Sequence, residues 1–265
     1  MFIKKLQGHS GCEVLLMRTD HNLIVRKISP SREYNARINK QRIKQENFSS
    51  CLFKTPKVYK NGEINKRKYF DMQFINGQTY NSFIEHSDQK SVIEAYKKIF
   101  DFVCKNNYIG ESIETEVLSK IERMSIDKSY DLYKDYCLDF NWSKINKSYC
   151  HGDLTFENII VSNSEIYLID FLDSFVDSKI IDYSKMMQDI ILGWSWREKK
   201  SKPYIRLICM YEHMSNNMKN NEFEASKRML VLNMLRVLPY SANNKKTIEI
   251  VNQNLQFLKR EFIDE

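Results

Sequence analysis

The sequence predicts an α+β fold with a small β-rich N-terminal lobe over residues 1–76 and a larger, mostly helical C-terminal lobe over residues 77–265. Runs of β-branched and aromatic residues gather before residue 76, whereas apolar residues three or four positions apart dominate after it. The chain contains only 7 Gly and 4 Pro, which argues against a loop-rich or all-β design. Its 265 residues suffice for two lobes that share a cleft and bury a proper core.

In the N-terminal lobe, residues 13–17 and 22–28 form apolar runs on either side of the polar turn Thr19-Asp20-His21, so we expect two strands there. The segment Gly8-His9-Ser10-Gly11 precedes the first run, as a tight loop would. Residues 31–48 are mostly polar with apolar residues at helical spacing, which predicts one amphipathic helix.

A hairpin is expected next, with strands at 57–59 and 68–75 around the turn pair Asn61-Gly62. Asn76-Gly77 breaks the second strand, and we place the lobe boundary there. The chain then becomes helical, with short apolar strands expected at 159–161 and 166–169. The expected helices cover 91–105, most of 114–136, 180–194, 203–219, 224–237 and 244–261.

Composition narrows the function classes. The six cysteines are scattered without a C-x-x-C pair, which is typical of reduced intracellular thiols rather than of a disulfide framework or a zinc site. The N-terminus has no apolar h-region, and no apolar run approaches the roughly 20 residues of a membrane span, so we expect a cytoplasmic protein without a membrane partner. The formal net charge of +7 raises a nucleic-acid hypothesis, but the basic residues are spread along the whole chain, which favours solvated helix faces.

The most informative segment is residues 150–161, where the polar cluster His151-Gly152-Asp153, followed by Asn158, runs directly into an apolar strand. A second strand ends at Asp170, which is 170 − 153 = 17 residues past Asp153. A carboxylate on a loop can accept a hydrogen bond from an attacking alcohol and take its proton late. Oxygens from Asn and Asp suit Mg²⁺. Phosphoryl transfer from a Mg-nucleotide needs these parts, so the pattern predicts a kinase.

The H-G-D-x-x-x-x-N loop at residues 151–158 and the Ile169-Asp170-Phe171 segment resemble the catalytic loop and metal-binding segment of the aminoglycoside phosphotransferase and choline kinase superfamily. These proteins are small-molecule relatives of the protein kinases. The resemblance implies a two-lobed protein-kinase-like fold with ATP or GTP in the cleft. It also implies that Asp153 is the catalytic base and that Asn158 and Asp170 hold Mg²⁺.

Further roles follow from the same resemblance. Gly8 to Gly11 would be the loop that covers the phosphates. The segment Met72–Gly77 resembles the linker between the lobes, where backbone groups near Gln73 and Ile75 would meet the adenine edge. Asp182 resembles the further Asp that braces the catalytic loop from the following helix.

Two residues are candidates for the cation that grips the phosphates. A V-A-I-K register over residues 24–27 selects Lys27, whereas the superfamily's V-L-R pattern selects Arg26. Adjacent strand residues face opposite ways, so only one of them can point into the cleft. The usual Glu partner of this cation is not obvious in the sequence. Spacing back from Pro56 places the expected position near Gln41, with Gln45 and Glu46 at the next turn, and a Gln there would hold a lysine by a neutral hydrogen bond.

The acceptor is expected to be a small molecule with a hydroxyl group, such as a sugar, an amino alcohol or an aminoglycoside-like compound. Gly152 stands where protein kinases have the Arg of H-R-D, and Leu172 where they have the Gly of D-F-G, so a protein substrate is disfavoured. A catalytically silent kinase-like nucleotide-binding module and a basic nucleic-acid-binding protein remain as alternatives. The oligomeric state stays open. Candidate substrate-lining residues are Asp173, Asp177, Asp189, Trp194, Trp196 and Arg197.

Overall fold

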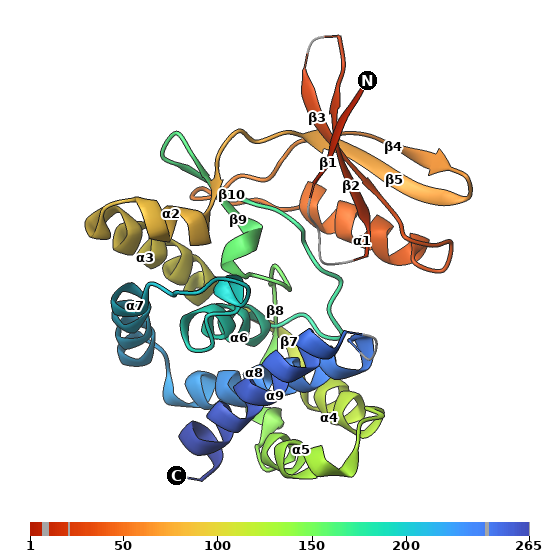
Figure 1. Ribbon diagram of the computed structural model, residues 1–265. Coiled ribbons are helices and arrows are strands. Elements are labelled where there is room, and N and C mark those ends of the chain that lie inside the picture. Colours follow the sequence, from red (N-terminus) through yellow and green to blue (C-terminus); the bar gives the residue numbers. More distant parts are fainter. Residues whose placement is uncertain (7–10, 21, 242–243, 265) are drawn as a thin grey trace. The chain divides into compact units, whose positions relative to one another are not determined.

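The computed structural model describes residues 1–6, 11–20, 22–241 and 244–264, and the chain divides into two compact units (Figure 1). The first unit consists of residues 1–83 together with 157–173, and the second of residues 84–156 together with 174–265. The chain therefore returns to the first unit for one short segment. That residues 1–76 form the nucleotide-binding lobe and residues 77–265 the substrate-binding lobe remains a prediction. Among the described helices, none has an apolar stretch long enough to cross a bilayer.

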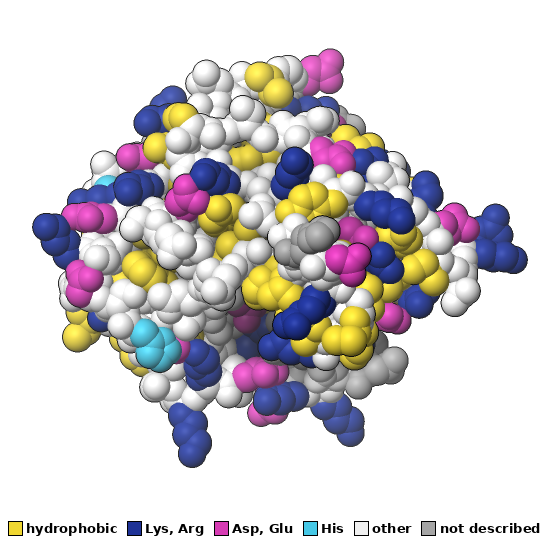
Figure 2. Space-filling model, turned by 90° about the horizontal axis from the view of Figure 1, so that it is seen from above, with side chains coloured by type: hydrophobic (Ala, Val, Ile, Leu, Met, Phe, Trp, Pro, Cys, Tyr) yellow, Lys and Arg dark blue, Asp and Glu magenta, His cyan; other side chains and the backbone are white. Residues whose placement is uncertain are grey.

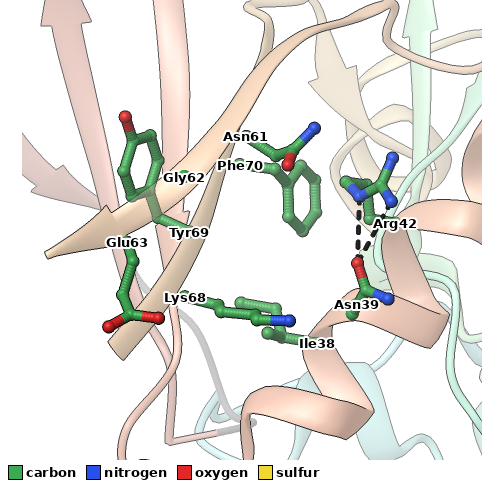
Figure 3. A pocket seen from close by; sticks show the side chains of 9 residues that line it. All are labelled: Ile38, Asn39, Arg42, Asn61, Gly62, Glu63, Lys68, Tyr69 and Phe70. Carbon is green, nitrogen blue, oxygen red and sulfur yellow. Dashed lines mark hydrogen bonds between the residues drawn. The ribbon is translucent and has the colours of Figure 1, made fainter. Parts of the chain in front are cut away.

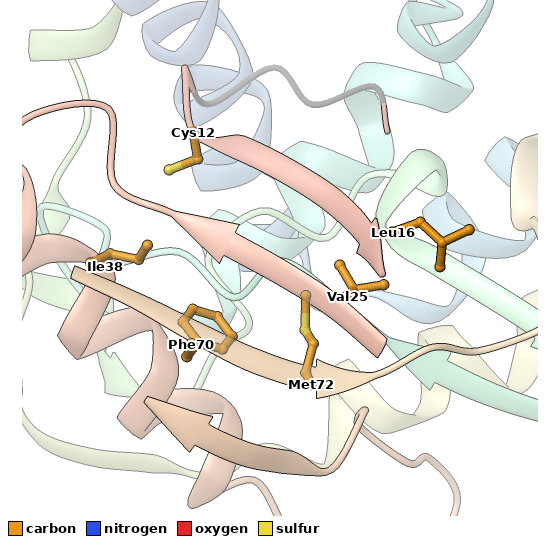
Figure 4. Close-up of a cluster of buried hydrophobic side chains, with 6 residues drawn as sticks. All are labelled: Cys12, Leu16, Val25, Ile38, Phe70 and Met72. Carbon is orange, nitrogen blue, oxygen red and sulfur yellow. The ribbon is translucent and has the colours of Figure 1, made fainter. Parts of the chain in front are cut away.

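Within the described part of the first unit, five strands form an antiparallel sheet in the order β1-β2-β3-β5-β4. These strands are β1 (Phe2–Leu6), β2 (Glu13–Arg18), β3 (Leu23–Ile28), β4 (Val58–Ile64) and β5 (Arg67–Gln73). Helix α1 (Asn35–Glu46) packs against β5 (Figure 1). Alternate residues of the strands point to one face, where they meet the helix in a buried cluster. Figure 4 shows this cluster, which consists of Cys12, Leu16, Val25, Ile38, Phe70 and Met72.

The hairpin β4–β5 turns at Asn65-Lys66, and the predicted turn at Asn61-Gly62 is wrong. Asn65 and Lys66 have φ values of 50° and 63°, the left-handed conformation that a two-residue hairpin turn requires. Gly62 instead lies inside β4 opposite Tyr69, and a Cβ atom there would come within 2.9 Å of the tyrosine ring. The glycine therefore makes room for an aromatic side chain within the sheet rather than bending the chain.

A second, smaller sheet brings the segment 157–173 into the first unit. Strands β6 (Gln78–Thr79), β9 (Ile159–Ser162) and β10 (Glu165–Leu168) pair in the order β10-β9-β6. The strand break predicted at Asn76-Gly77 is present, and it has a steric reason. A Cβ atom on Gly77 would lie 2.5 Å from the carbonyl oxygen of Val161, so only glycine fits beside β9.

The second unit is mostly helical, as predicted. Helix α6 is its centre: it packs against α3, α7 and α8, and every one of its residues except Lys185 is buried. The helices are α2 (Tyr80–His86), in which the chain leaves the first unit, and then α3 (Gln89–Lys105), α4 (Glu114–Glu122), α5 (Asp131–Leu138), α6 (Lys179–Ile190), α7 (Tyr204–Asn217), α8 (Asn220–Tyr240) and α9 (Lys245–Leu258).

Several described elements depart from those expected, and two of the departures have a local cause. The expected helix over 114–136 is two helices, because Asp127 accepts a hydrogen bond from the Ser129 N–H at 2.8 Å and starts a new turn. Strand β1 was not predicted, because its residues are mostly exposed and carry no apolar alternation. The short pair β7 (Tyr108–Ser112) and β8 (Asn146–Ser148) was also missed.

Candidate functional site

The loop that carries Asp153 is tied to helix α6 through its backbone. The carboxylate of Asp182 accepts hydrogen bonds from the N–H groups of His151 at 2.7 Å and Gly152 at 2.8 Å. Asp182 is fully buried, so these bonds form away from water, where they are stronger. Gly152 has a φ of 93°, a conformation that other residues rarely adopt. Asp182 therefore has the bracing position that its sequence context predicted.

A second buried carboxylate of α6 holds the other end of the same loop. Asp189 accepts hydrogen bonds from the N–H of Phe156 at 2.6 Å and from the N–H of Ser195 at 2.8 Å. Asp189 was predicted to line the substrate site, but it is fully buried and occupied by these backbone groups. Its place is structural: it anchors the loop that follows Asp153 and the turn that follows α6.

Asp153 lies between these two anchors. Its Oδ1 is 3.0 Å from the Nζ of Lys185, and the two side chains are 28% and 16% exposed. Its backbone N–H donates to the Nδ1 of His151 at 3.2 Å, and its carbonyl oxygen accepts from the N–H of Thr155 at 2.8 Å. The His151 ring thus accepts at Nδ1, as a neutral imidazole does. His151 therefore helps to hold the loop in place.

Asn158 and Asp170 lie at one end of the β9–β10 hairpin in the first unit. The register pairs Ile159 with Leu168, and the Ile169 N–H donates to the carbonyl oxygen of Asn158 at 3.0 Å. Asp170 follows directly, with a φ of 60° that turns it out of the strand. Asp and Asn adopt this left-handed conformation more readily than most residues.

Lys27 lies beside Asp170, although 143 residues separate them in the sequence. The Nζ of this buried lysine forms an ion pair with Asp170 and donates a hydrogen bond to the Oε1 of Gln41 at 2.9 Å. Burial alone would lower the pKa of Lys27, but the Asp170 carboxylate outweighs it and the pKa is raised. The neutral hydrogen bond expected from Gln41 is present.

Arg26 lies on the face of β3 opposite to Lys27, where it binds a different carboxylate. Its guanidinium donates two hydrogen bonds to the carboxylate of Asp71, at 2.7 and 2.8 Å, and lies 4.2 Å from the centre of the Tyr69 ring. The hydrogen bond to Asp71 is the main cause of the raised pKa of Arg26. The two candidate cations therefore have separate carboxylate partners within the same unit.

Three of the remaining predicted nucleotide contacts are described, and they lie close to strand ends of the first unit. Gly8 is outside the described residues, whereas Gly11 has a φ of 74° and open space where a Cβ would stand. Gln73 is the last residue of β5, and its N–H donates to the carbonyl oxygen of Lys57 at 2.9 Å. Ile75 lies two residues beyond the strand and is buried.

The donor set at the hairpin end fits a magnesium ion. Asn158 and Asp170 bring an amide oxygen and a carboxylate to neighbouring positions of one hairpin. Mg²⁺ favours oxygen ligands and takes few of them from protein, because it keeps waters and phosphate oxygens in its shell. The Asp170 carboxylate already faces one cation, the ammonium of Lys27.

Three further predicted substrate-lining residues make contacts within the second unit. Trp196 is buried, and its Nε1 donates to the Oε1 of Glu85 at 2.7 Å. Arg197 lies over the ring of Trp194, with its Cζ 5.1 Å from the ring centre. Lys185 was missed, although its spacing from Asp182 and Asp189 on one helix was a signal available in the sequence.

A pocket of about 190 Å³ lies in the first unit between α1 and the β4–β5 hairpin (Figure 3). Figure 3 shows Arg42 and Asn39 of α1 hydrogen-bonded to each other beside it, with Phe70 and Tyr69 on the hairpin. The described residues that line it include none of the predicted catalytic, nucleotide-binding or metal-binding residues.

Neither protein-family models nor curated proteins give a match to this sequence. Solved structures do match over nearly the whole chain. A thermostable mutant of aminoglycoside phosphotransferase APH(4)-Ia, in a ternary complex with ADP and hygromycin B, has a TM-score of 0.73 at 11% identity, covering 99% of this chain and 94% of that one.

Two other structures are similar. The choline kinase LicA from Streptococcus pneumoniae has a TM-score of 0.61 at 14% identity, covering 98% of this chain and 94% of that one. A putative fructosamine-3-kinase from Haemophilus somnus 129PT has a TM-score of 0.58 at 14% identity, covering 99% of this chain and 92% of that one. The likeness predicted from the 151–170 segment is thus confirmed at the level of fold, and the chain has the α+β kinase-like fold of the aminoglycoside phosphotransferase and choline kinase structures.

Proposed function

We propose that this protein is a kinase that transfers the γ-phosphoryl group of Mg-ATP or Mg-GTP to a hydroxyl group of a small polar molecule. The observation that carries the proposal is the ion pair between Lys27 and Asp170, supported by Gln41. A buried lysine on a sheet, a carboxylate after a hairpin and an H-G-D loop are parts that phosphoryl transfer uses for positioning and charge neutralisation. One of the structures with a similar fold is an aminoglycoside phosphotransferase with bound ADP, which supports the same class of reaction for this protein.

In this mechanism Asp153 orients the acceptor hydroxyl toward the γ-phosphorus and accepts its proton late in the transfer. Lys27 donates hydrogen bonds to phosphate oxygens, while Gln41 keeps its ammonium in place. Asn158 and Asp170 would hold Mg²⁺, which neutralises phosphate charge when it is bound. The backbone of residues 73–75 and the loop around Gly11 would position the adenine and the phosphates. Arg26 is the weaker candidate, because its guanidinium binds Asp71, whereas the ammonium of Lys27 lies beside Asp170, one of the proposed magnesium ligands.

We expect an uncharged, polyhydroxylated acceptor rather than a polycation, because three carboxylates of the second unit close to the H-G-D loop are already engaged. A strongly cationic substrate needs carboxylates that face it. The carboxylates of Asp182 and Asp189 are occupied by backbone N–H groups, and that of Asp153 has an ammonium beside it. Hygromycin B is bound in the similar phosphotransferase structure. We include it among the acceptors to be tested, but we do not expect it to be the substrate.

The two alternatives are less well supported. A catalytically silent nucleotide-binding module would not need Asp153, Asn158 and Asp170 together, yet all three are present. A nucleic-acid binder needs basic residues gathered on one surface. Figure 2 shows Lys and Arg side chains interspersed with Asp and Glu side chains on the face displayed.

The test is nucleotide turnover by the purified protein. Pools of sugars, amino alcohols and aminoglycosides are supplied with ATP or GTP, and acceptor-dependent release of the nucleoside diphosphate is measured with Mg²⁺ and with EDTA. We expect turnover that requires Mg²⁺ and falls roughly 100-fold or more in Asp153→Asn, because a general base contributes about that much. Asp135→Asn, an exposed carboxylate of α5, is the matched control.

Binding is measured separately by titration with Mg-ATP and Mg-GTP. A folded wild-type protein that binds neither nucleotide would contradict the kinase proposal. Nucleotide binding without turnover of any acceptor would favour the silent module. Nucleic-acid binding that weakens steeply with salt and is unaffected by Asp153→Asn would favour the nucleic-acid-binding alternative.

A further inference from the structure

Helix α6 presents one row of three charged residues toward the loop that carries Asp153. Asp182, Lys185 and Asp189 are spaced 185 − 182 = 3 and 189 − 185 = 4 residues apart, so they lie on one face of the helix. The two aspartates hold the backbone on either side of Asp153, at Gly152 and at Phe156. Lys185 is between them, and its Nζ lies 3.0 Å from the Oδ1 of Asp153.

Lys185 differs from the rest of α6 in its exposure. It is the one residue of this helix that is not buried, and its side chain is still only 16% exposed. Ion pairs on the open surface contribute little, because water screens them and both side chains lose conformational freedom. Here the helix and both loop anchors already restrict the two partners, so the cost in entropy is lower and the contact has a defined geometry.

We propose that Lys185 is a positioning residue for the catalytic base: it binds one oxygen of the Asp153 carboxylate and thereby sets the direction in which the carboxylate receives the acceptor hydroxyl. This inference rests on the kinase function proposed above. A carboxylate aimed by a fixed ammonium reaches the near-attack geometry more often than one that rotates freely.

Other titratable groups face this loop from the elements around it. His151 accepts the Asp153 N–H, and the Cys150 thiol lies 3.3 Å from an oxygen of Asp177. Tyr149 precedes them, and burial raises the pKa of its hydroxyl. Asp182 and Asp189 complete the set. Lys185 is a group of opposite charge in the second unit that contacts the Asp153 carboxylate.

The experiment compares Lys185→Met and Lys185→Arg with the wild type, using Lys147→Met as the matched control. Lys147 forms a similar ion pair with Glu116 in the same unit, with Nζ 2.6 Å from Oε1. We expect Lys185→Met to lower kcat about 10-fold or more, because orientation is lost, while KM for the nucleotide changes less than about two-fold. Lys185→Arg keeps the charge and should recover most of kcat. Lys147→Met should match the wild type.

The pH profile separates positioning from a merely structural role. Loss of an adjacent positive charge disfavours an ionised carboxylate, so the acidic limb of the kcat profile should lie at higher pH in Lys185→Met than in the wild type. A ¹³C-aspartate NMR titration reports the same shift without turnover, with the Asp153 signal identified by its loss in Asp153→Asn. An unchanged kcat and titration would overturn the proposal, and so would a loss of kcat with no shift in either profile.

Different results would contradict the kinase function and the role of Lys185. A wild-type protein with no turnover and no nucleotide binding would remove the kinase function, and with it the role of Lys185. An active wild-type protein whose Lys185→Met variant keeps its kcat would remove the role of Lys185 alone. Circular dichroism and urea unfolding of each variant show whether it is folded.

Discussion

The carboxylate of Asp182 binds the backbone N–H of Gly152 at 2.8 Å across 30 residues of sequence, and the same side chain binds the N–H of His151. A buried helix thus holds the turn that immediately precedes Asp153. The position of the candidate base depends on this helix as well as on the loop's own sequence.

We predict that Asp182→Asn destabilises the protein by about 2–4 kcal/mol, because the amide offers one acceptor where the carboxylate offered two, and a buried N–H is left unpaired. Urea unfolding measures the change. Asp127→Asn is the control, since Asp127 also accepts a backbone N–H but is exposed. Equal destabilisation of the two variants would contradict the importance of the buried bonds.

We predict that Gly77→Ala destabilises the protein by about 1–3 kcal/mol through overpacking. The new Cβ would meet the Val161 carbonyl oxygen at 2.5 Å and the Ile160 Cγ2 at 2.7 Å, and β9 would have to shift. Thermal unfolding reports the loss. The neighbouring Asn76→Ala, an exposed side chain, should stay within about 0.5 kcal/mol of the wild type. A Gly77→Ala protein with wild-type stability would show that β9 adapts freely.

We predict that Arg26→Met costs about 3 kcal/mol, because it leaves the Asp71 carboxylate, only 4% exposed, without its guanidinium partner. Replacing both residues, in Arg26→Met/Asp71→Met, should recover part of this stability, since no uncompensated charge remains. A double-mutant cycle in urea measures the coupling. Additive losses would indicate that the two side chains act independently.

His213 predicts a pH dependence of stability. Burial beside the Tyr96 and Phe100 rings is the main cause of its lowered pKa, and Lys97 lowers it further while Asp101 raises it. A lowered pKa means that the unfolded chain binds the proton first, so this contribution to stability is complete above about pH 6.5 and is lost as the pH falls through the lower folded-state value.

The check is urea unfolding of the wild type and His213→Phe between pH 7.5 and 4.5, a range set by the ordinary histidine value of about 6.5. Phenylalanine keeps the edge contacts with Tyr96 and Phe100 and removes the titration. We expect the stability of the variant to fall less steeply with acid than that of the wild type. Parallel curves would show that other groups cause the acid sensitivity.

Local patterns were sufficient for most elements of the fold. Apolar spacing predicted helix α3 and the strands around residues 159–168 closely, because their buried faces repeat with the helix and strand periods. The hairpin turn was misplaced because Asn61-Gly62 is a stronger local turn signal than Asn65-Lys66. Packing decided the register: the ring of Tyr69 needs the space that Gly62 leaves.

The amino-acid sequence alone established the H-G-D loop, the Asn and Asp that follow it and the α+β fold, because each is encoded within a few tens of adjacent residues. Only the tertiary structure showed that Lys27 and Arg26 have different carboxylate partners, and only it identified Lys185 and Asp189 as neighbours of the loop. These relationships join residues far apart in the chain: Lys27 and Asp170 are separated by 143 positions. Such contacts depend on how buried side chains pack, and spacing along the chain does not report which face of a strand or helix meets which partner.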